Sequence, residues 1–165
     1  MKALLRLVIL ATVLAASACA SHLPSPGSRS TEASRTLVIR FLDALDRGDW
    51  ATLDKMVTAD YKHRVVTATG FSERTWETFR KGNQAARLAS PDWKNTPVQI
   101  VVDGNRAAVL LAGHGTHRGS FGGEKPTGKT MDLPVAVFLE IRGDKIAGDW
   151  EVSDAAPLMR KLSQP

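Results

Sequence analysis

The sequence has only one cysteine in 165 residues, so a disulfide framework within the chain is excluded and the fold depends on its apolar core. It also lacks an internal repeat of about 20 to 50 residues and a long run of like charge. No HExxH zinc motif occurs, and the Gly-Lys-Thr at 128–130 lacks the context of a phosphate loop, which follows a strand and opens a helix. What remains is globular material with 43% hydrophobic and 24% charged residues, and its length indicates one domain.

Residues 1–18 are predicted to be a signal peptide. Lys2 and Arg6 form a basic start, residues 7–16 are uncharged and mostly apolar, and small residues follow. The apolar run is too short to cross a bilayer, which needs about 20 residues, but it has the length of a secretory signal. Removing this segment lowers the formal net charge from +5 to +3. That mildly basic balance does not indicate a nucleic-acid partner.

The single cysteine, Cys19, directly follows Ala-Ser-Ala. This placement resembles a bacterial lipobox, in which the signal is cut before a cysteine that becomes lipidated, although Ala16 stands where leucine is usual. A plain cut after Ala18 or Ala20 is the alternative.

Residues 19–30 are then the lipidated cysteine and a flexible tether rich in Ser, Pro and Gly. No Asp follows Cys19 to suggest inner-membrane retention. We therefore expect an exported protein of the cell envelope, an outer-membrane lipoprotein facing the periplasm.

The folded domain is expected to span residues 31–165, with helices first and strands afterwards. Asp103-Gly104 between apolar runs is a hairpin signal. This order predicts an α+β fold with a curved antiparallel sheet of about four to six strands and three or four helices. The expected helices are one from Thr31 with Ser30 as N-cap and Gly48 as stop, a short one capped by Asp49, one from the N-cap Ser72 to Pro91, and one at 155–162. The expected strands cover 60–66, 96–104, 106–119, 131–141 and 146–154.

The last strand, IAGDWEVSD, carries the clearest candidate chemistry. A period of two places Trp150 and Asp154 on one face with Ile146 and Val152, and an acid on such an apolar face is unusual. Asp154 can be a pocket acid, the cap of a helix beginning at Ala155, or a residue at a wet sheet edge. Burial beside Trp150 would favour the first; exposure with a bond to the backbone N–H of Ala156 or Leu158 would favour the second.

Residues 115–129 contain five glycines between two strand-like runs, with His117 at the entrance. Four segments together resemble the SnoaL-like polyketide cyclases: this loop with Gly115-Thr116-His117 and Pro126-Thr127-Gly128-Lys129, LDRGDWATLDKMVTADYKHR, PDW at 91–93, and DKIAGDWEVSD. The resemblance runs from about Leu37 to Leu162. It implies the nuclear-transport-factor-2-like fold, a cone of curved antiparallel sheet closed by helices, in which the glycines let the chain turn back at the wide end.

The resemblance also implies acid/base chemistry without a cofactor, namely an intramolecular aldol closure or isomerisation on a carbonyl-rich or cyclic substrate. By position, Asp154 corresponds to the family's general acid/base, with Trp150 as an apolar wall. The cyclases place a His on the preceding strand, but LPVAVFLEI has none. Either the chemistry differs, with His117 as a substitute, or the pocket only binds; His117 can also be structural, bonding the loop backbone.

Other candidate ligand-binding residues are His63, Trp76, Phe79 and His114. His63 can equally be a core or rim histidine, and Trp76 and Phe79 can equally be core residues. His114 and His117 have opposite parity in a strand, which argues against a shared metal site, and no metal is expected.

Two classes of function follow: an envelope-tethered enzyme of SnoaL type, or a non-catalytic domain that holds an apolar small molecule or a protein partner. Dimers are common among such folds, so a homodimer is a further expectation.

Overall fold

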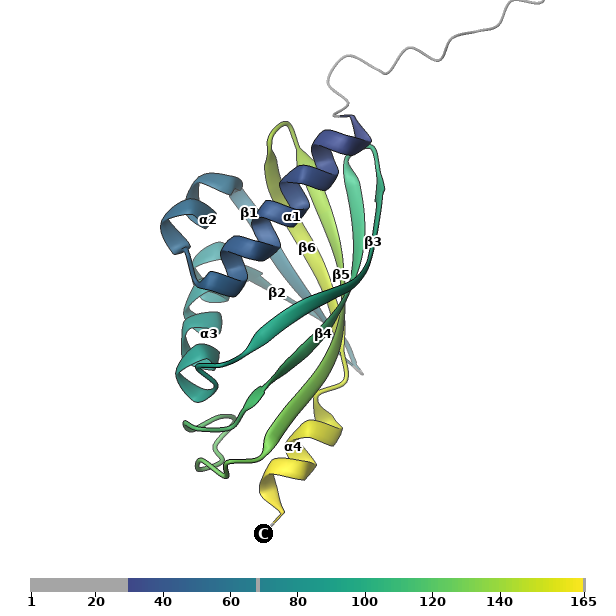
Figure 1. Ribbon diagram of the computed structural model, residues 1–165. Coiled ribbons are helices and arrows are strands. Elements are labelled where there is room, and N and C mark those ends of the chain that lie inside the picture. The colour runs from purple at the N-terminus through teal and green to yellow at the C-terminus, as the bar shows by residue number, and fades with distance from the viewer. Residues whose placement is uncertain (1–29, 68, 165) are drawn as a thin grey trace, which may run out of the picture.

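The computed structural model describes residues 30–67 and 69–164. Cys19 and the predicted signal peptide lie outside these residues. Within the described part the elements are, in chain order, α1 (Thr31–Arg47), α2 (Trp50–Met56), β1 (Val57–Thr67), β2 (Gly70–Thr75), α3 (Trp76–Ala89), β3 (Lys94–Asp103), β4 (Arg106–Thr116), β5 (Thr130–Arg142), β6 (Lys145–Ser153) and α4 (Ala156–Ser163) (Figure 1).

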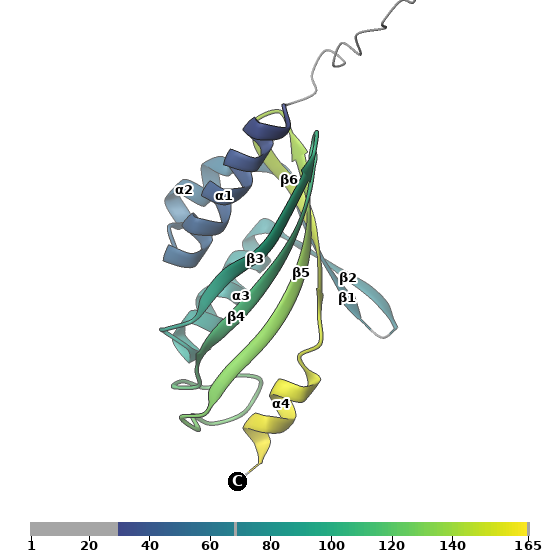
Figure 2. The same ribbon diagram turned by 45° about the vertical axis from the view of Figure 1, so that its right-hand side comes forward.

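The six strands form one curved sheet in the order β2-β1-β6-β5-β4-β3. Helices α1, α2 and α3 cover its concave face, and α4 follows the end of β6 and lies beside the first part of β5 (Figure 2). The predicted α+β cone is therefore confirmed. The sheet is mixed, however, because β1 pairs with β6 in parallel while every other pair in the described chain is antiparallel. Strand direction at this pair depends on a contact far apart in sequence, which local patterns do not encode.

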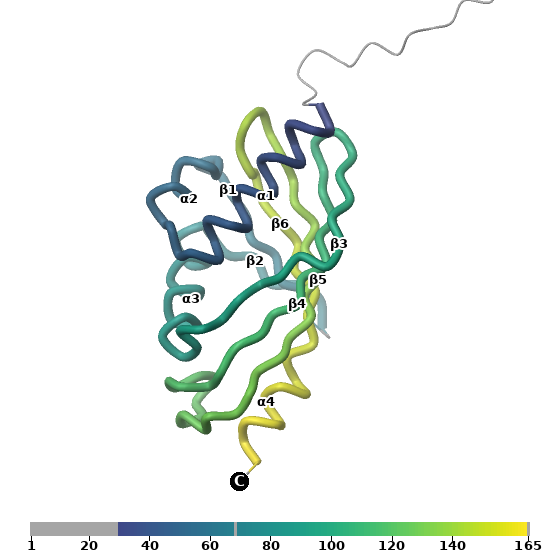
Figure 3. The backbone as a smooth tube through the Cα atoms, viewed as in Figure 1, coloured from purple at the N-terminus to yellow at the C-terminus, as the bar shows by residue number. Residues whose placement is uncertain are grey.

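The first two helices form where their capping signals predict. The Ser30 side chain accepts a hydrogen bond from the Ala33 N–H at 3.2 Å. At the other end Gly48 has a φ of 65°, a left-handed conformation that glycine adopts without steric cost. Asp49 then caps α2 by accepting from the Thr52 N–H at 3.1 Å. The apolar stripe of α1 packs onto the sheet across strands that are distant in sequence (Figure 3).

The third helix begins later than predicted. Ser72 is not its N-cap, because residues 70–75 pair with β1 as strand β2, with Ser72 opposite Val65. Thr75 is the cap, accepting from the Thr78 N–H at 3.4 Å. Leu88 is 79% exposed, because it lies nine residues after the inward-facing Phe79 and so falls on the opposite side of the helix.

Glycines in β4 make room for an indole ring. A Cβ atom added at Gly113 would lie 2.4 Å from the Trp93 ring and 2.8 Å from the Leu133 carbonyl oxygen. Gly115 is similarly close to Ser90 and Trp93. Since real Cβ atoms do not approach so closely, these two positions require glycine for packing.

The main core fills the space between α1, α2 and the concave face of the sheet. A second, smaller cluster joins Met131 of β5 to Leu158 and Leu162 of α4, with Trp93 and Phe121 packed against it. No helix in the described ranges has the length and apolar character needed to cross a membrane.

Candidate active site

A cavity of about 230 Å³ lies between the concave face of the sheet and helices α1, α3 and α4. Most of its wall is apolar, contributed by α1, β4, β5 and α4. Two groups of polar side chains interrupt this wall. The first comprises Tyr61, Asp149 and Glu151; the second comprises Asn83, Arg87, Ser90 and Asn95.

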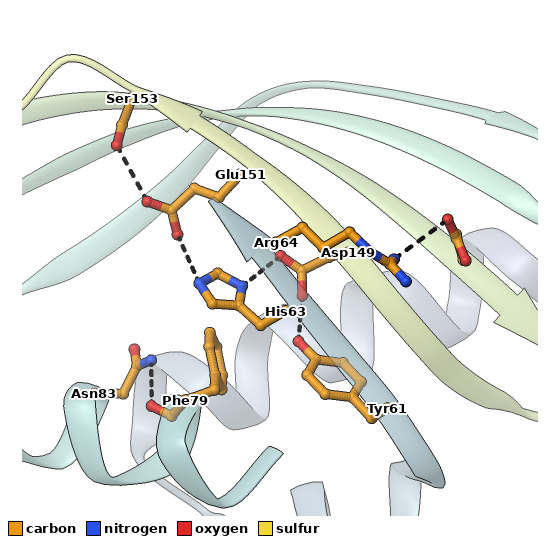
Figure 4. A network of polar contacts seen from close by, with 9 residues as sticks. Tyr61, His63, Arg64, Phe79, Asn83, Asp149, Glu151 and Ser153 are labelled. Carbon is orange, nitrogen blue, oxygen red and sulfur yellow. Dashed lines mark hydrogen bonds and ion pairs between the residues drawn. The ribbon is translucent and has the colours of Figure 1, made fainter. Parts of the chain in front are cut away.

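The Asp149 carboxylate is the centre of the first group, and it is only 3% exposed. The Tyr61 hydroxyl donates a hydrogen bond to one of its oxygens, and His63 Nδ1 lies 2.9 Å from the other. The parallel pairing of β1 with β6 creates this arrangement, because it sets His63 directly opposite Asp149. Figure 4 shows the three side chains converging from the two strands.

His63 lies between two carboxylates. Its Nε2 is 3.8 Å from Glu151, which follows Asp149 by two residues and projects from the same face of β6. The Glu151 side chain is 29% exposed, against 5% for Asp149, so Glu151 is the more accessible of the two acids in the cavity wall. The Ser153 hydroxyl donates to the other Glu151 oxygen at 3.1 Å.

Aromatic rings enclose this polar group. The Phe79 ring lies 4.7 Å from the His63 ring, and Trp76 meets Tyr61 edge-on at 5.2 Å. Burial, followed by the adjacent Asp149 charge, raises the pKa of the Tyr61 phenol far above its ordinary value. Tyr61 is therefore a neutral hydrogen-bond donor at any physiological pH.

Two of the predicted ligand-binding aromatics thus lie at this site. Phe79 is part of the cavity wall. Trp76 stands one layer behind it, stacked on Phe79 at 5.4 Å, while its indole N–H donates to Asp54 at 2.7 Å. Its contacts are those of a core residue that supports the wall. His63 is in contact with the wall through Asp149 and Phe79.

The assignment of Asp154 as the pocket acid is wrong. Asp154 is exposed, and its carboxylate accepts a hydrogen bond from the Ala156 N–H at 3.1 Å. Strand β6 ends at Ser153, so Asp154 stands at the start of α4 and stabilises the first turn of that helix. This is the capping alternative.

Trp150 also lies away from the cavity, on the convex face of the sheet. Its ring packs edge-on against Phe71 at 5.0 Å, and the Arg64 guanidinium lies 5.1 Å from its centre. The prediction that the apolar face of β6 points inward is wrong for this part of the strand. Asp149 and Glu151 point inward instead, because they contact Tyr61 and His63 of the neighbouring strand β1.

The other two histidines among the described residues are not in the cavity wall. His117 is fully buried in the glycine loop: its backbone N–H donates to the Lys129 carbonyl, and its ring Nδ1 lies 3.0 Å from the Thr127 hydroxyl. These bonds agree with the structural alternative, in which His117 holds the loop backbone. Because His117 is outside the cavity wall, it is not a substitute for the missing catalytic histidine. His114 lies on the opposite face, two-thirds exposed and 2.8 Å from Asp132, so it is not a pocket residue either.

Sequence reasoning missed the acids that do line the cavity. The signal was present as two short alternations, Tyr61-x-His63 and Asp149-x-Glu151, each on one face of a strand. The described ranges contain no cluster of three or more His, Cys, Asp or Glu side chains that could hold a metal ion.

A pair of substitutions separates the two aspartates. Asp149→Asn removes the charged acceptor of both Tyr61 and His63 and leaves one of them without any acceptor in a buried site, so we expect it to lower the free energy of unfolding by about 1–3 kcal/mol. Asp154→Asn is expected to change it by less than about 0.5 kcal/mol, because Asn serves helix starts as well as Asp. Urea denaturation followed by circular dichroism measures both. Equal effects of the two substitutions would contradict the assigned positions.

Comparison with known proteins agrees with the fold and the family resemblance. The family model of the SnoaL-like polyketide cyclases matches residues 36–162. Similar solved structures include AclR from Streptomyces galilaeus, with 23% identity, a TM-score of 0.73, and coverage of 82% of this chain and 100% of that chain. IdmH from Streptomyces antibioticus has 23% identity, a TM-score of 0.69, and coverage of 79% and 99%. A SnoaL-like polyketide cyclase from Agrobacterium tumefaciens has 21% identity, a TM-score of 0.63, and coverage of 79% and 98%.

No curated protein matches the chain. The structural likenesses, all at low identity, establish the fold, while the family model covers most of the sequence. The chain therefore belongs to the SnoaL-like polyketide cyclase family.

Proposed function

We propose that this protein is a cofactor-free acid/base enzyme acting on a small carbonyl-rich or cyclic molecule, with chemistry of the aldol-cyclase or isomerase type. One observation carries the proposal: two carboxylates from one strand flank a single imidazole at the wall of a mostly apolar cavity. Membership of the SnoaL-like family supports the same class of chemistry.

In this reaction Glu151 is the base, since it is the more exposed of the two acids in the cavity wall. Its carboxylate removes a proton from the carbon beside a carbonyl group, which leaves an enolate. The enolate carbon bonds to a second carbonyl carbon of the same molecule, and the resulting alkoxide takes the proton back. In an isomerisation the proton returns to a different carbon. No atom is gained or lost overall.

The remaining polar residues position this base. Tyr61 holds the Asp149 carboxylate, and Asp149 in turn holds Nδ1 of the His63 ring. The other ring nitrogen of His63, Nε2, then faces Glu151. Apolar surroundings exclude water, which strengthens electrostatic contacts to the developing enolate. Asp149 itself already has two hydrogen-bonding partners, so it is a positioning residue.

Proton exchange gives a direct test. The probe 2-acetylnaphthalene carries an enolisable methyl group on an apolar two-ring skeleton. We expect the wild-type protein to accelerate exchange of this methyl group in D₂O, followed by NMR. Glu151→Gln keeps the shape but removes the base, so the enzyme-dependent rate should fall by about 100-fold or more.

Asp154→Asn is the matched control, since it removes an exposed carboxylate outside the cavity and should leave the rate unchanged. Equal rates for wild type and Glu151→Gln would contradict the role of Glu151. Binding of the probe without any exchange would favour the second candidate, a non-catalytic ligand-binding domain. That candidate is favoured by one distance: at 3.8 Å, His63 Nε2 and Glu151 are beyond hydrogen-bonding range.

We also propose that Cys19 is the acylated N-terminus of an outer-membrane lipoprotein facing the periplasm. The support is the sequence pattern of residues 1–21. Mass spectrometry of the mature protein should find a diacylglyceryl-modified and N-acylated Cys19. An unmodified terminus at Cys19 or Ser21 would instead mean a freely secreted protein.

The convex face of the sheet supports a homodimer. Exposed apolar side chains from all six strands lie on this face, opposite the cavity: Val66, Phe71, Val101, Leu110, Phe138 and Val152. Monomeric proteins rarely expose so extended an apolar patch. We infer that a second copy of the chain covers it.

Sedimentation velocity tests the dimer. Wild type should sediment as a dimer at micromolar concentration, and Phe138→Lys, in the centre of the patch, should shift it toward monomer. Leu88→Lys is the control, because Leu88 is an even more exposed apolar side chain on α3, away from this face. A monomeric wild-type protein would contradict the proposal.

A further inference from the structure

One stripe of α3 faces the cavity and is unusually polar for an inward face. Phe79, Asn83 and Arg87 follow one another at intervals of four residues and all line the cavity. Residues at this spacing share one side of a helix. An inward-facing stripe normally continues with apolar residues, so the amide and the guanidinium are polar exceptions in this wall.

The Arg87 guanidinium has spare hydrogen-bonding capacity. It donates one hydrogen bond, to the Leu45 carbonyl oxygen at 2.5 Å, near the C-terminus of α1. A guanidinium carries five N–H donors. None of the ion pairs in residues 30–67 and 69–164 includes Arg87. A positive charge without a carboxylate partner therefore lies in the wall of a mostly apolar cavity.

The cationic and acidic ends of the cavity are well separated. Phe79 packs on His63, beside Asp149 and Glu151. Arg87 is eight residues farther along α3, which corresponds to about 12 Å of helix axis. The two polar groups thus stand at opposite ends of an apolar middle section formed in part by Leu133 and Val135 of β5.

We propose that the ligand is a rigid, two-ended molecule with an anionic oxygen group, such as a carboxylate, bound by Arg87 and a carbonyl group at Glu151. The carbonyl end rests on the proposed function, whereas the anionic end rests on Arg87 alone. Repulsion by the two acids also fixes the direction of binding, because it disfavours the anionic group at their end. A guanidinium suits this role since it can donate two parallel hydrogen bonds to one carboxylate.

Two probes that differ only at the anionic end test the inference. The compounds 6-acetyl-2-naphthoate and 2-acetylnaphthalene share the acetyl group and the ring system, and only the first carries a carboxylate at the opposite end. Titration followed by NMR gives both dissociation constants. We expect wild type to bind the carboxylate compound about tenfold more tightly or better, as a charge-assisted contact provides.

Arg87→Gln should abolish this preference while binding of 2-acetylnaphthalene persists. Arg40→Gln is the matched control: it removes the same charge from an exposed position on α1 and should leave the preference intact. Should Arg87→Gln fail to fold, the Arg87 side-chain NMR signals of wild type answer the question. They should shift with the carboxylate compound and not with the neutral one.

Equal affinities in wild type, or a preference that survives in Arg87→Gln, would overturn the anionic end and leave the proposed catalysis standing. Tight binding of both probes with no methyl exchange would overturn the catalysis and leave the Arg87 preference as evidence for the anionic end. Failure of both probes to bind would overturn both proposals together.

Discussion

The buried carboxylate of Asp149 is the constraint on which the site depends. A carboxyl group that is only 3% exposed is costly to bury unless its hydrogen bonds are satisfied, and here Tyr61 and His63 satisfy them. Both donors come from β1, so the acid of β6 can be buried only if β1 lies beside β6 in the observed register. The same interaction therefore secures the parallel strand pair and aims the imidazole at Glu151. The hydrogen bonds to Asp149 therefore both stabilise the fold and position the candidate catalytic residues.

Along one stretch of β6 the usual distribution of polarity is reversed. Here the acids Asp149 and Glu151 point inward, whereas Trp150 and Val152 point outward, with Phe138 of β5 beside them. A protein that encloses a polar site needs charged residues inside, and one that buries its outer face against a partner needs apolar residues outside. Both the cavity proposal and the dimer proposal explain this reversal, from opposite sides of the same strands.

Local signals in the sequence were enough for much of the fold. Ser30, Gly48 and Asp49 marked helix ends correctly because capping depends on a few neighbouring atoms. The turn at Gly104 joined β3 and β4 as predicted, with a φ of 53°. Ser72 misled because a serine can cap a helix or lie in an edge strand, and only pairing with β1 decides between them.

The site was less predictable, because it depends on which face of β6 points inward. The rule that apolar residues are buried placed Trp150 and Asp154 in the cavity, and the long-range pairing with β1 placed Asp149 and Glu151 there instead. His63 was recognised, but its partners lie 86 and 88 residues away, beyond the reach of any local pattern.

The most direct measurement of the central claim is the protonation of the His63 ring in solution, read by NMR of the ¹⁵N-labelled imidazole. The account predicts a proton on Nδ1 that exchanges slowly with water, because it is held by Asp149, and that shows nuclear Overhauser effects to the Phe79 ring. A His63 ring with no proton on Nδ1, or with one that exchanges as fast as an exposed histidine's, would contradict the account.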